Sequence, residues 1–182
     1  MGWGRSHWVI LSEVIMSKSV NYAGDLRIYS APSALVSHVE WAINQHLGVA
    51  QDFHWLPQPL SPGAYSLEFE WKKSKAIAAK LAIALRGWHF IRFEMREVNI
   101  ATTEGVLFRC TPDLGLHQVT TGSTGDVMIP ENQISNLIYK SLSVEKLKSG
   151  LENAIGTQWE LELEPFRIAL AERGQESLSQ IG

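Results

Sequence analysis

The sequence SKAIAAKLAIALRGWHFIRFE, from Ser74 to Glu94, is the stretch that decides the central part of the fold. Residues 76–86 contain one lysine and one arginine among apolar side chains, and five of those apolar residues are alanine. A surface helix normally has one apolar stripe and one polar face, so we expect this helix to be covered on more than one side. Ser74 is expected to cap its start and Gly87 to end it. Residues 88–94 then alternate apolar and charged side chains, which predicts a strand.

Working outward from this stretch, hydrophobic periodicity predicts a second helix and three further strands in the first half of the chain. The predicted strands are residues 26–30, 49–56, 65–71 and 88–98, and the predicted helices are residues 32–47 and 74–86. The order strand, helix, strand, strand, helix, strand is that of a split βαβ arrangement. We therefore predict an α+β fold with a ferredoxin-like core at about residues 25–98.

The sequence of the second half of the chain predicts a β-meander followed by helices. Short strands separated by turn residues are expected at 106–111, 114–121 and 127–129. Helices are expected from Pro130, from Ser143 and from Thr157, where Thr157 and Glu160 fit a capping box. Pro165 is expected to shorten or kink the last helix. We place the meander and helices, at about 99–171, in one domain spanning 25–182, with the C-terminal helices packed over the alanine-rich helix.

Composition limits the functional classes. The chain of 182 residues has 16 basic and 19 acidic residues, for a net charge of −3, and no clustered basic run. Nucleic-acid binding is therefore disfavoured, because phosphate contacts draw on clustered lysine and arginine. Cys110 is the only cysteine, so no disulfide can form within the chain, and a reducing cytoplasm is the simplest setting.

The N-terminal residues 1–24 show weak patterning and are treated as an extension. Their apolar run, WVILSEVIM at Trp8–Met16, is interrupted by Glu13 and is not followed by a cleavage pattern, so it does not fit a signal peptide. No stretch of the sequence reaches the roughly 20 apolar residues of a membrane span. Whether translation starts at Met1 or Met16 is left open.

Candidate reactive groups are few. The six histidines show no metal-ligand spacing, so we predict no metal site and no cofactor. Cys110 lies mid-strand beside apolar residues and is interpreted as a core residue. The segment TTGSTGD, residues 120–126, is interpreted as a hairpin turn, because a phosphate cradle should open a helix. Asp52 and His54 lie two apart on a predicted strand and therefore share a face.

RNA binding is a hypothesis because an RNA recognition motif has the same element order. Tyr65, Phe69 and Trp71 lie on one face of the predicted third strand, where such a motif stacks bases. The basic and glycine signature of that motif is absent, and acidic residues occupy the alternating face. We expect these aromatic residues to pack under the helices or the meander.

Several short strings resemble an actinobacterial family of uncharacterised proteins, catalogued as a domain of unknown function. They occur in order over about residues 25–167: SAP at 30–32, HVEWA at 38–42, AKLAIALRGW at 79–88, ATTEG at 101–105, TPDLG at 111–115, GDVMIPE at 125–131 and ELEPFR at 162–167. The resemblance implies a cytoplasmic bacterial protein. It implies no reaction and brings no catalytic or binding residue.

Our leading hypothesis is a non-catalytic binding or interaction module, with self-association into a homo-oligomer as one form of that interaction. It depends on the absence of a recognisable catalytic constellation and on a high tryptophan content. Trp41 is the tryptophan expected at an interface, because it lies at the edge of its helix stripe.

The second hypothesis is a small-molecule-binding domain or enzyme, with a pocket lined by the loops at 57–63 and 101–105. Its polar groups would be Asp52, His54, Arg92, Thr103 and Glu104. Convergence of these side chains around a deep pocket would favour this hypothesis.

Overall fold

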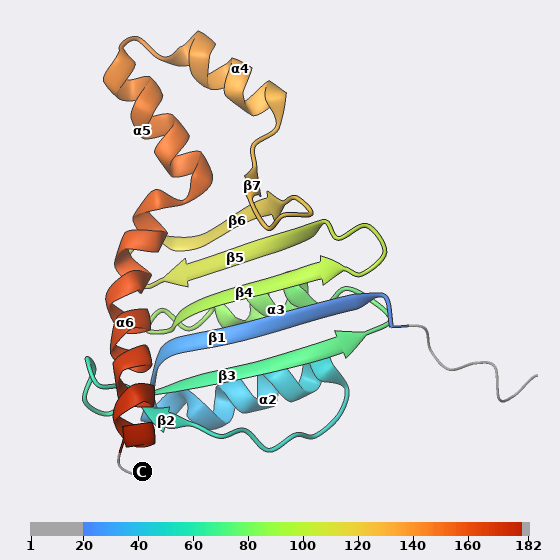
Figure 1. Ribbon diagram of the computed structural model, residues 1–182, viewed down its shortest axis with the longest axis vertical. Coiled ribbons are helices and arrows are strands. Elements are labelled where there is room, and N and C mark those ends of the chain that lie inside the picture. The colour runs from blue at the N-terminus through green and yellow to red at the C-terminus, as the bar shows by residue number, and fades with distance from the viewer. Residues whose placement is uncertain (1–19, 180–182) are drawn as a thin grey trace, which may run out of the picture.

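The computed structural model describes the backbone of residues 20–179 and the side chains of residues 20–173. The strands are β1 (Tyr22–Pro32), β2 (Leu56–Pro57), β3 (Ala64–Lys73), β4 (Arg92–Asn99), β5 (Gly105–Thr111), β6 (Gly115–Thr121) and β7 (Val127–Met128). They form one antiparallel sheet in the order β2-β3-β1-β4-β5-β6-β7 (Figure 1).

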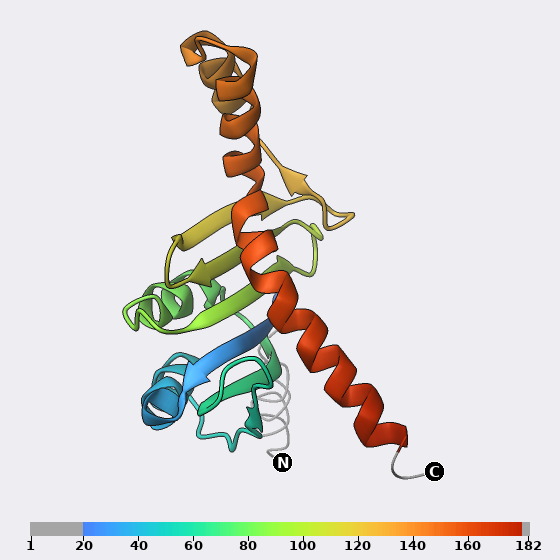
Figure 2. The same ribbon diagram turned by 90° about the vertical axis from the view of Figure 1, so that its left-hand side faces the viewer.

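The helices lie on both faces of the sheet and beyond its end. They are α2 (Val36–Leu47), α3 (Ala78–Leu85), α4 (Glu131–Lys140), α5 (Val144–Ile155) and α6 (Thr157–Ser179), with one 3₁₀ turn at Ser33–Leu35. Helices α2 and α3 cover one face, and α6 crosses the opposite face near one end of the strands (Figures 1 and 2). Helices α4 and α5 project past β7 and away from the body of the sheet.

The core lies between the sheet and the α2–α3 layer. Its largest fully buried side chains come from alternate positions of the central strands and from one stripe of each helix: Leu26, Ile28, Ile43, Leu81, Leu85, Phe93, Met95 and Phe108. Alternation places every second strand residue on this face, which is why apolar and charged residues alternate so clearly in β3 and β4. The predicted α+β class is confirmed.

Glu97 connects the sheet to the start of α3. Its carboxylate accepts hydrogen bonds from the amides of Ile77 (2.9 Å) and Ala78 (3.2 Å) and from Trp71 Nε1 (3.1 Å). The predicted cap, Ser74, does not serve, because α3 begins later and its free amides are satisfied by this buried carboxylate from β4. Trp71 fits beneath Gly24, where an added Cβ would lie 2.2 Å from Trp71 Cζ2.

The predicted ferredoxin-like order is wrong for this sheet. The outer edge of β4 pairs with β5 from Phe93↔Cys110 to Val98↔Gly105, so the meander continues the same sheet and does not form an added layer. The predicted strand at 49–56 is reduced to the two residues of β2, which lie at the sheet edge. The outcome is a seven-stranded antiparallel sheet with C-terminal helices.

The expectation that α3 is covered on more than one side is also wrong. Its buried residues, Ala78, Leu81, Ala82 and Leu85, form a single stripe. Ala79 is exposed, and Ile83 is 60% exposed. The C-terminal helix α6 crosses the other face of the sheet and cannot reach α3.

The meander and the three C-terminal helices lie where the sequence predicts them, with two local differences. Helix α6 continues through Pro165, which therefore does not end it. Glu160 does not complete a capping box, because its carboxylate is directed at Arg109 and Arg167. At the other end of the chain, β1 begins at Tyr22, inside the predicted extension, and Met1 and Met16 lie outside the described residues.

Candidate functional site

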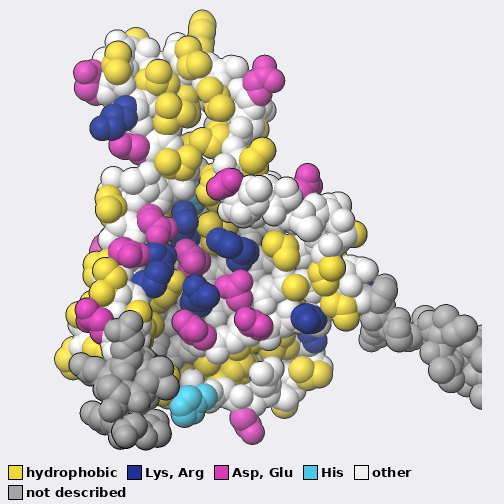
Figure 3. Space-filling view, in the orientation of Figure 1, with side chains coloured by type: hydrophobic (Ala, Val, Ile, Leu, Met, Phe, Trp, Pro, Cys, Tyr) yellow, Lys and Arg dark blue, Asp and Glu magenta, His cyan; other side chains and the backbone are white. Residues whose placement is uncertain are grey.

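Charged side chains gather on the sheet face that α2 and α3 leave uncovered (Figure 3). The strand pairings place Glu68 (β3), Arg27 (β1), Glu94 (β4) and Arg109 (β5) next to one another, so four side chains of alternating sign form a row. His117 (β6) follows Arg109 at the end of this row. Opposite charges on neighbouring strands stabilise a sheet, whereas like charges directly opposite destabilise it. This row is therefore compatible with a structural role as well as with a site.

Helix α6 docks on this face through a cluster of ion pairs. Arg109 pairs with Glu94 (3.2 Å) and with Glu160 (2.9 Å). Arg167 pairs with Glu160 (2.6 Å), Glu94 (3.4 Å) and Glu164. Burial alone would raise the pKa of Glu160, but the hydrogen bond from Arg167 and the charges of both arginines outweigh it and lower that pKa. Each charge of the cluster has an opposite partner, so the cluster binds α6 to the sheet.

A second ion pair lies beside this cluster. Arg92 Nη2 lies 3.2 Å from Glu162 Oε1, and the Arg92 guanidinium lies over the Phe166 ring at 4.7 Å from its centroid. Tyr29, buried under the same helix, accepts a hydrogen bond from Arg167 Nε at 3.3 Å through its hydroxyl. Burial raises the pKa of Tyr29, so this hydroxyl stays protonated at neutral pH.

The α5–α6 junction is fixed by residues of β5 and β6. The His117 ring stacks on Trp159 with centroids 4.5 Å apart, and its Nε2 lies 3.2 Å from the Ala154 carbonyl oxygen. Burial lowers the pKa of His117. Gly156 ends α5 with φ +82°, and a Cβ there would lie 2.6 Å from the His117 ring, so only glycine fits this turn.

A groove of about 570 Å³ separates the C-terminal half of α6 from β3 and β1. Its polar lining includes Arg27, His54, Glu68, Arg167 and Arg173. Three arginines and a histidine thus face one carboxylate, although Arg167 also belongs to the ion cluster. This groove is the part of the charged face with a local excess of positive charge.

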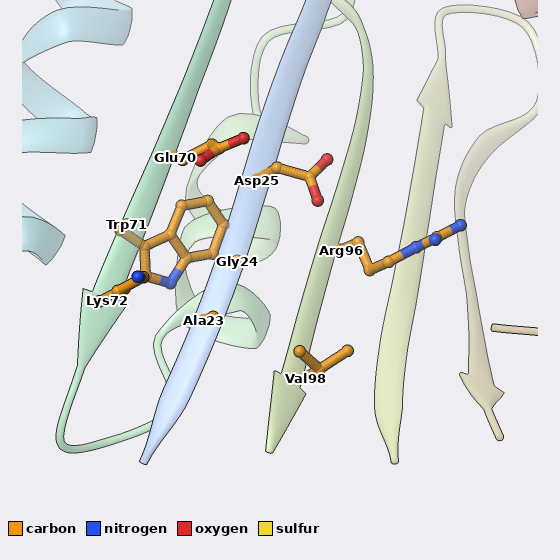
Figure 4. A pocket seen from close by; sticks show the side chains of 8 residues that line it. All are labelled: Ala23, Gly24, Asp25, Glu70, Trp71, Lys72, Arg96 and Val98. Carbon is orange, nitrogen blue, oxygen red and sulfur yellow. The ribbon is translucent and has the colours of Figure 1, made fainter. Parts of the chain in front are cut away.

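A shallower depression of about 450 Å³ lies further along the same face (Figure 4). Gly24 and Ala23 form its floor, and Asp25, Glu70 and Arg96 lie around it. Asp25 and Glu70 are direct cross-strand partners, and burial, followed by the nearby carboxylates, raises the pKa of Asp25 against the pull of Arg27 and Arg96. The Arg96 side chain extends away across β5, so the depression has no convergent set of polar groups.

The five site residues predicted from sequence do not converge. Asp52 lies in an exposed loop, His54 lines the α6 groove, and Arg92 pairs with Glu162 beneath α6. Thr103, which has φ +59°, and Glu104 belong to the turn between β4 and β5.

The two predicted loops lie at opposite ends of the sheet. The loop at 57–63 leads into Ala64, the partner of Pro32, whereas the loop at 101–105 follows Asn99, the partner of Tyr22. The ends of β1 are roughly 33 Å apart for a strand of this length. A single small-molecule pocket cannot be lined by both loops.

The remaining candidates are mostly core residues. Phe69 and Trp71 are buried under the helices, which removes the exposed aromatic face on which RNA binding depended. Burial raises the pKa of the Cys110 thiol to about 11, so it is a poor nucleophile. Among the described residues there is no group of three potential metal ligands, and no helix is long and apolar enough to cross a bilayer.

Comparison with known proteins identifies a family. The model of the family described as "Protein of unknown function (DUF3145)" matches residues 26–180. The chain belongs to the DUF3145 family. No curated protein and no solved structure gives a significant match. The DUF3145 match includes α4 and α5 as well as the sheet, so the projecting helices are part of the family domain.

These projecting helices form an apolar surface that the sequence did not reveal. Helix α4 has no buried residue and α5 has one, Ala154. Four large apolar side chains around the connection between the helices are open to solvent: Ile138 (60% exposed), Tyr139 (89%), Leu142 (86%) and Val144 (76%). Figure 3 shows hydrophobic side chains spread over this part of the molecule. The available signal was an apolar cluster at a predicted helix–helix connection, where polar residues are expected.

Proposed function

We propose that this DUF3145 protein is a non-catalytic interaction protein that binds a partner through the hairpin formed by α4 and α5, residues 131–155. The observation that carries the proposal is the exposure of Ile138, Tyr139, Leu142 and Val144, on and between two helices with almost no buried residue. Exposed apolar patches of this kind mark interaction sites in soluble proteins.

The low stability expected of an isolated α4–α5 hairpin supports the same conclusion. Isolated helices shorter than about 12–15 residues are marginal in water, and α4 and α5 have 10 and 12 residues. Their mutual packing is limited to a stripe in which Leu137 lies against Gly150, where a Cβ would approach Leu137 Cδ2 to 2.8 Å. A partner that covers the outer face would supply the burial that the hairpin lacks.

Other exposed apolar residues make weaker candidates. Trp41 and Ile83 are exposed on α2 and α3, but each of these helices already buries four residues in the core. Their stability therefore requires no partner. We also propose the actinobacterial and cytoplasmic setting implied by the resemblance, which the single buried cysteine supports.

Site-specific photo-crosslinking tests the proposal. A photoreactive phenylalanine analogue replaces Tyr139 in one variant and Phe90, an exposed aromatic residue between α3 and β4, in a matched control. Irradiation of cells that make the protein at its natural level should give a discrete adduct from position 139 and none from position 90. The absence of an adduct at 139, or the same adduct at both positions, would contradict the proposal.

A second candidate function is binding of a small anionic molecule in the α6 groove. It is favoured by the arginines and histidine that line a groove of about 570 Å³. Native mass spectrometry of the purified protein should then show a retained acidic compound that is lost in Arg27→Glu. Ligand-free protein, with no thermal stabilisation by carboxylates or phosphates, would remove this candidate.

A further inference from the structure

The hairpin has two chemically different ends. Its tip, residues 138–148, contains the four exposed apolar side chains together with Lys140, Lys146, Lys148 and Glu145, so it carries an excess of two positive charges. Its base, where α4 begins and α5 ends, carries Glu131 and Glu152, and Glu152 also lies 3.7 Å from Lys148 of the same helix. The hairpin as a whole is neutral, with three lysines and three glutamates.

The base also has a groove whose lining mixes polar and apolar residues. A groove of about 270 Å³ opens between β6, β7 and the two legs of the hairpin. Met128 and Pro130 supply part of its apolar lining, and Gln133 and Asn153 supply part of its polar lining. Met128 at its rim is more than half exposed. Each molecule therefore has an apolar tip and, at the base of the hairpin, a groove that offers both apolar side chains and polar groups.

The charges and apolar side chains of the hairpin favour one kind of partner over the others. Nucleic acid or an anionic membrane surface is bound through a surplus of basic residues, which the neutral hairpin does not have. Two tips placed together would repel, because each has a positive excess. A tip placed on the base of a second hairpin would bring lysines to glutamates and apolar side chains to Met128 and Pro130.

We infer that the partner is a second copy of this chain, with the two hairpins side by side and antiparallel so that each tip contacts the base of the other. The inference rests on the proposed function and adds the identity of the partner. The contact is reciprocal, so it closes as a two-fold dimer and does not propagate. Four short amphipathic helices then share one core, as in a helix bundle.

The available area is sufficient for such a dimer. A buried aliphatic side chain removes roughly 60–120 Å² from water and a tyrosine roughly 150–250 Å². One tyrosine and three aliphatic side chains at the tip thus supply on the order of 300–500 Å² per copy. A standard interface buries about 800 Å² per partner, of which about 500 Å² is apolar. The tips supply most of that apolar part.

Sedimentation velocity of the purified full chain provides the first test. The expected mass is about twice the 20.4 kDa of one chain. Ile138→Glu should yield monomer, because it places a carboxylate in the shared core. Ile83→Glu is the matched control, since Ile83 has the same 60% exposure on α3 and should leave the dimer intact. Circular dichroism of both variants checks that the sheet remains folded.

Charge reversal tests the antiparallel arrangement with variants at exposed positions. One variant carries Lys140→Glu and Lys146→Glu at the tip, and the other carries Glu131→Lys and Glu152→Lys at the base. Each alone should dimerise about tenfold more weakly, because like charges then face each other twice. An equimolar mixture should restore wild-type affinity as a heterodimer, since both contacts again join opposite charges.

The outcomes separate this inference from the function on which it rests. A wild-type chain that stays monomeric, a dimer unaffected by Ile138→Glu, or a mixture that does not recover affinity would overturn the second copy as partner. If position 139 then crosslinks to a different protein in cells, the interaction function stands with another partner. If position 139 crosslinks to nothing, both the inferred dimer and the proposed interaction function are wrong.

Discussion

At the residue scale, Glu97 is the side chain on which the packing of α3 most depends. It is buried, and it satisfies two amides at the start of α3 as well as the indole N–H of Trp71. Leaving a buried donor unsatisfied costs about 1–3 kcal/mol. The sequence showed Glu97 only as one more charged residue at a strand end, because nothing local indicates that a carboxylate will point into the core.

Two substitutions of Glu97 should destabilise the protein to different extents. Glu97→Gln keeps one oxygen acceptor and should lower the free energy of unfolding by about 1–2 kcal/mol. Glu97→Ala leaves all three donors without a partner and should lower it by about 3 kcal/mol or more. Urea denaturation measures both values. Equal stability of Glu97→Ala and wild type would contradict this role.

Two alanines of α3 form a matched pair. Ala82 is fully buried against the sheet, whereas Ala79 faces solvent. Ala82→Leu should cost about 1–3 kcal/mol by overpacking, and Ala79→Leu should change stability by less than about 0.5 kcal/mol. Thermal denaturation of the two variants checks this. Comparable destabilisation at both positions would show that α3 is covered on its outer side after all.

At the element scale, α6 is bound to the sheet mainly by paired charges, and Arg167 is central to that cluster. Arg167→Ala removes the partner of Glu164 and the donor to Tyr29, and it leaves Glu94 and Glu160 with Arg109 alone. Breaking a largely buried pair is expected to cost about 2–4 kcal/mol. The loss should appear as faster hydrogen exchange in residues 160–173.

A surface ion pair in the neighbouring helix is the control for that variant. Lys148 and Glu152 lie 3.7 Å apart at an exposed i,i+4 position. Lys148→Ala should change stability by less than about 0.5 kcal/mol. If Lys148→Ala and Arg167→Ala have the same small effect, α6 is held by apolar packing and not by its charges.

The α5–α6 junction should respond to pH through His117. Burial lowers the pKa of this residue below its ordinary value of 6.5, and the adjacent Arg109 acts in the same direction. The unfolded chain therefore takes up a proton near pH 6.5 that the folded chain takes up only at lower pH. Stability is complete above pH 6.5 and falls as the pH drops through the folded pKa.

A non-titrating variant isolates this contribution. Between pH 7 and pH 5, amides near residues 154–159 should lose protection in the wild type and lose less in His117→Gln. Glu160 lies beside the same junction, and its pKa is lowered below 4.5, so its contribution is lost at a more acidic pH. Identical pH profiles for the wild type and His117→Gln would contradict the assignment to His117.

At the scale of the whole molecule, the sequence predicted the elements better than their arrangement. Alternation in β3 and β4 and the glycine ends of α2 and α5 are local signals, and those elements lie close to the expected positions. Strand order depends on which edges pair, and nothing in residues 92–98 indicated that β4 would accept β5 on its free edge. The predicted ferredoxin-like order failed at this point.

The candidate site was less predictable than the fold. The five residues chosen for their chemistry lie apart, because the loops at 57–63 and 101–105 lie at opposite ends of the sheet. The exposed tip at Ile138–Val144 was not predicted, because an amphipathic helix pattern does not reveal whether its apolar side is covered within the chain or by a partner.

The central claim is that a partner covers the α4–α5 hairpin, and hydrogen exchange of residues 131–155 over a dilution series of the wild-type protein tests it most directly. An isolated hairpin should exchange almost freely, because it has one buried residue. With a second copy as partner, we expect protection in these residues that rises with protein concentration, while the sheet stays equally protected throughout. Strong protection of the hairpin that does not change on dilution below the dimer's dissociation range would contradict the account.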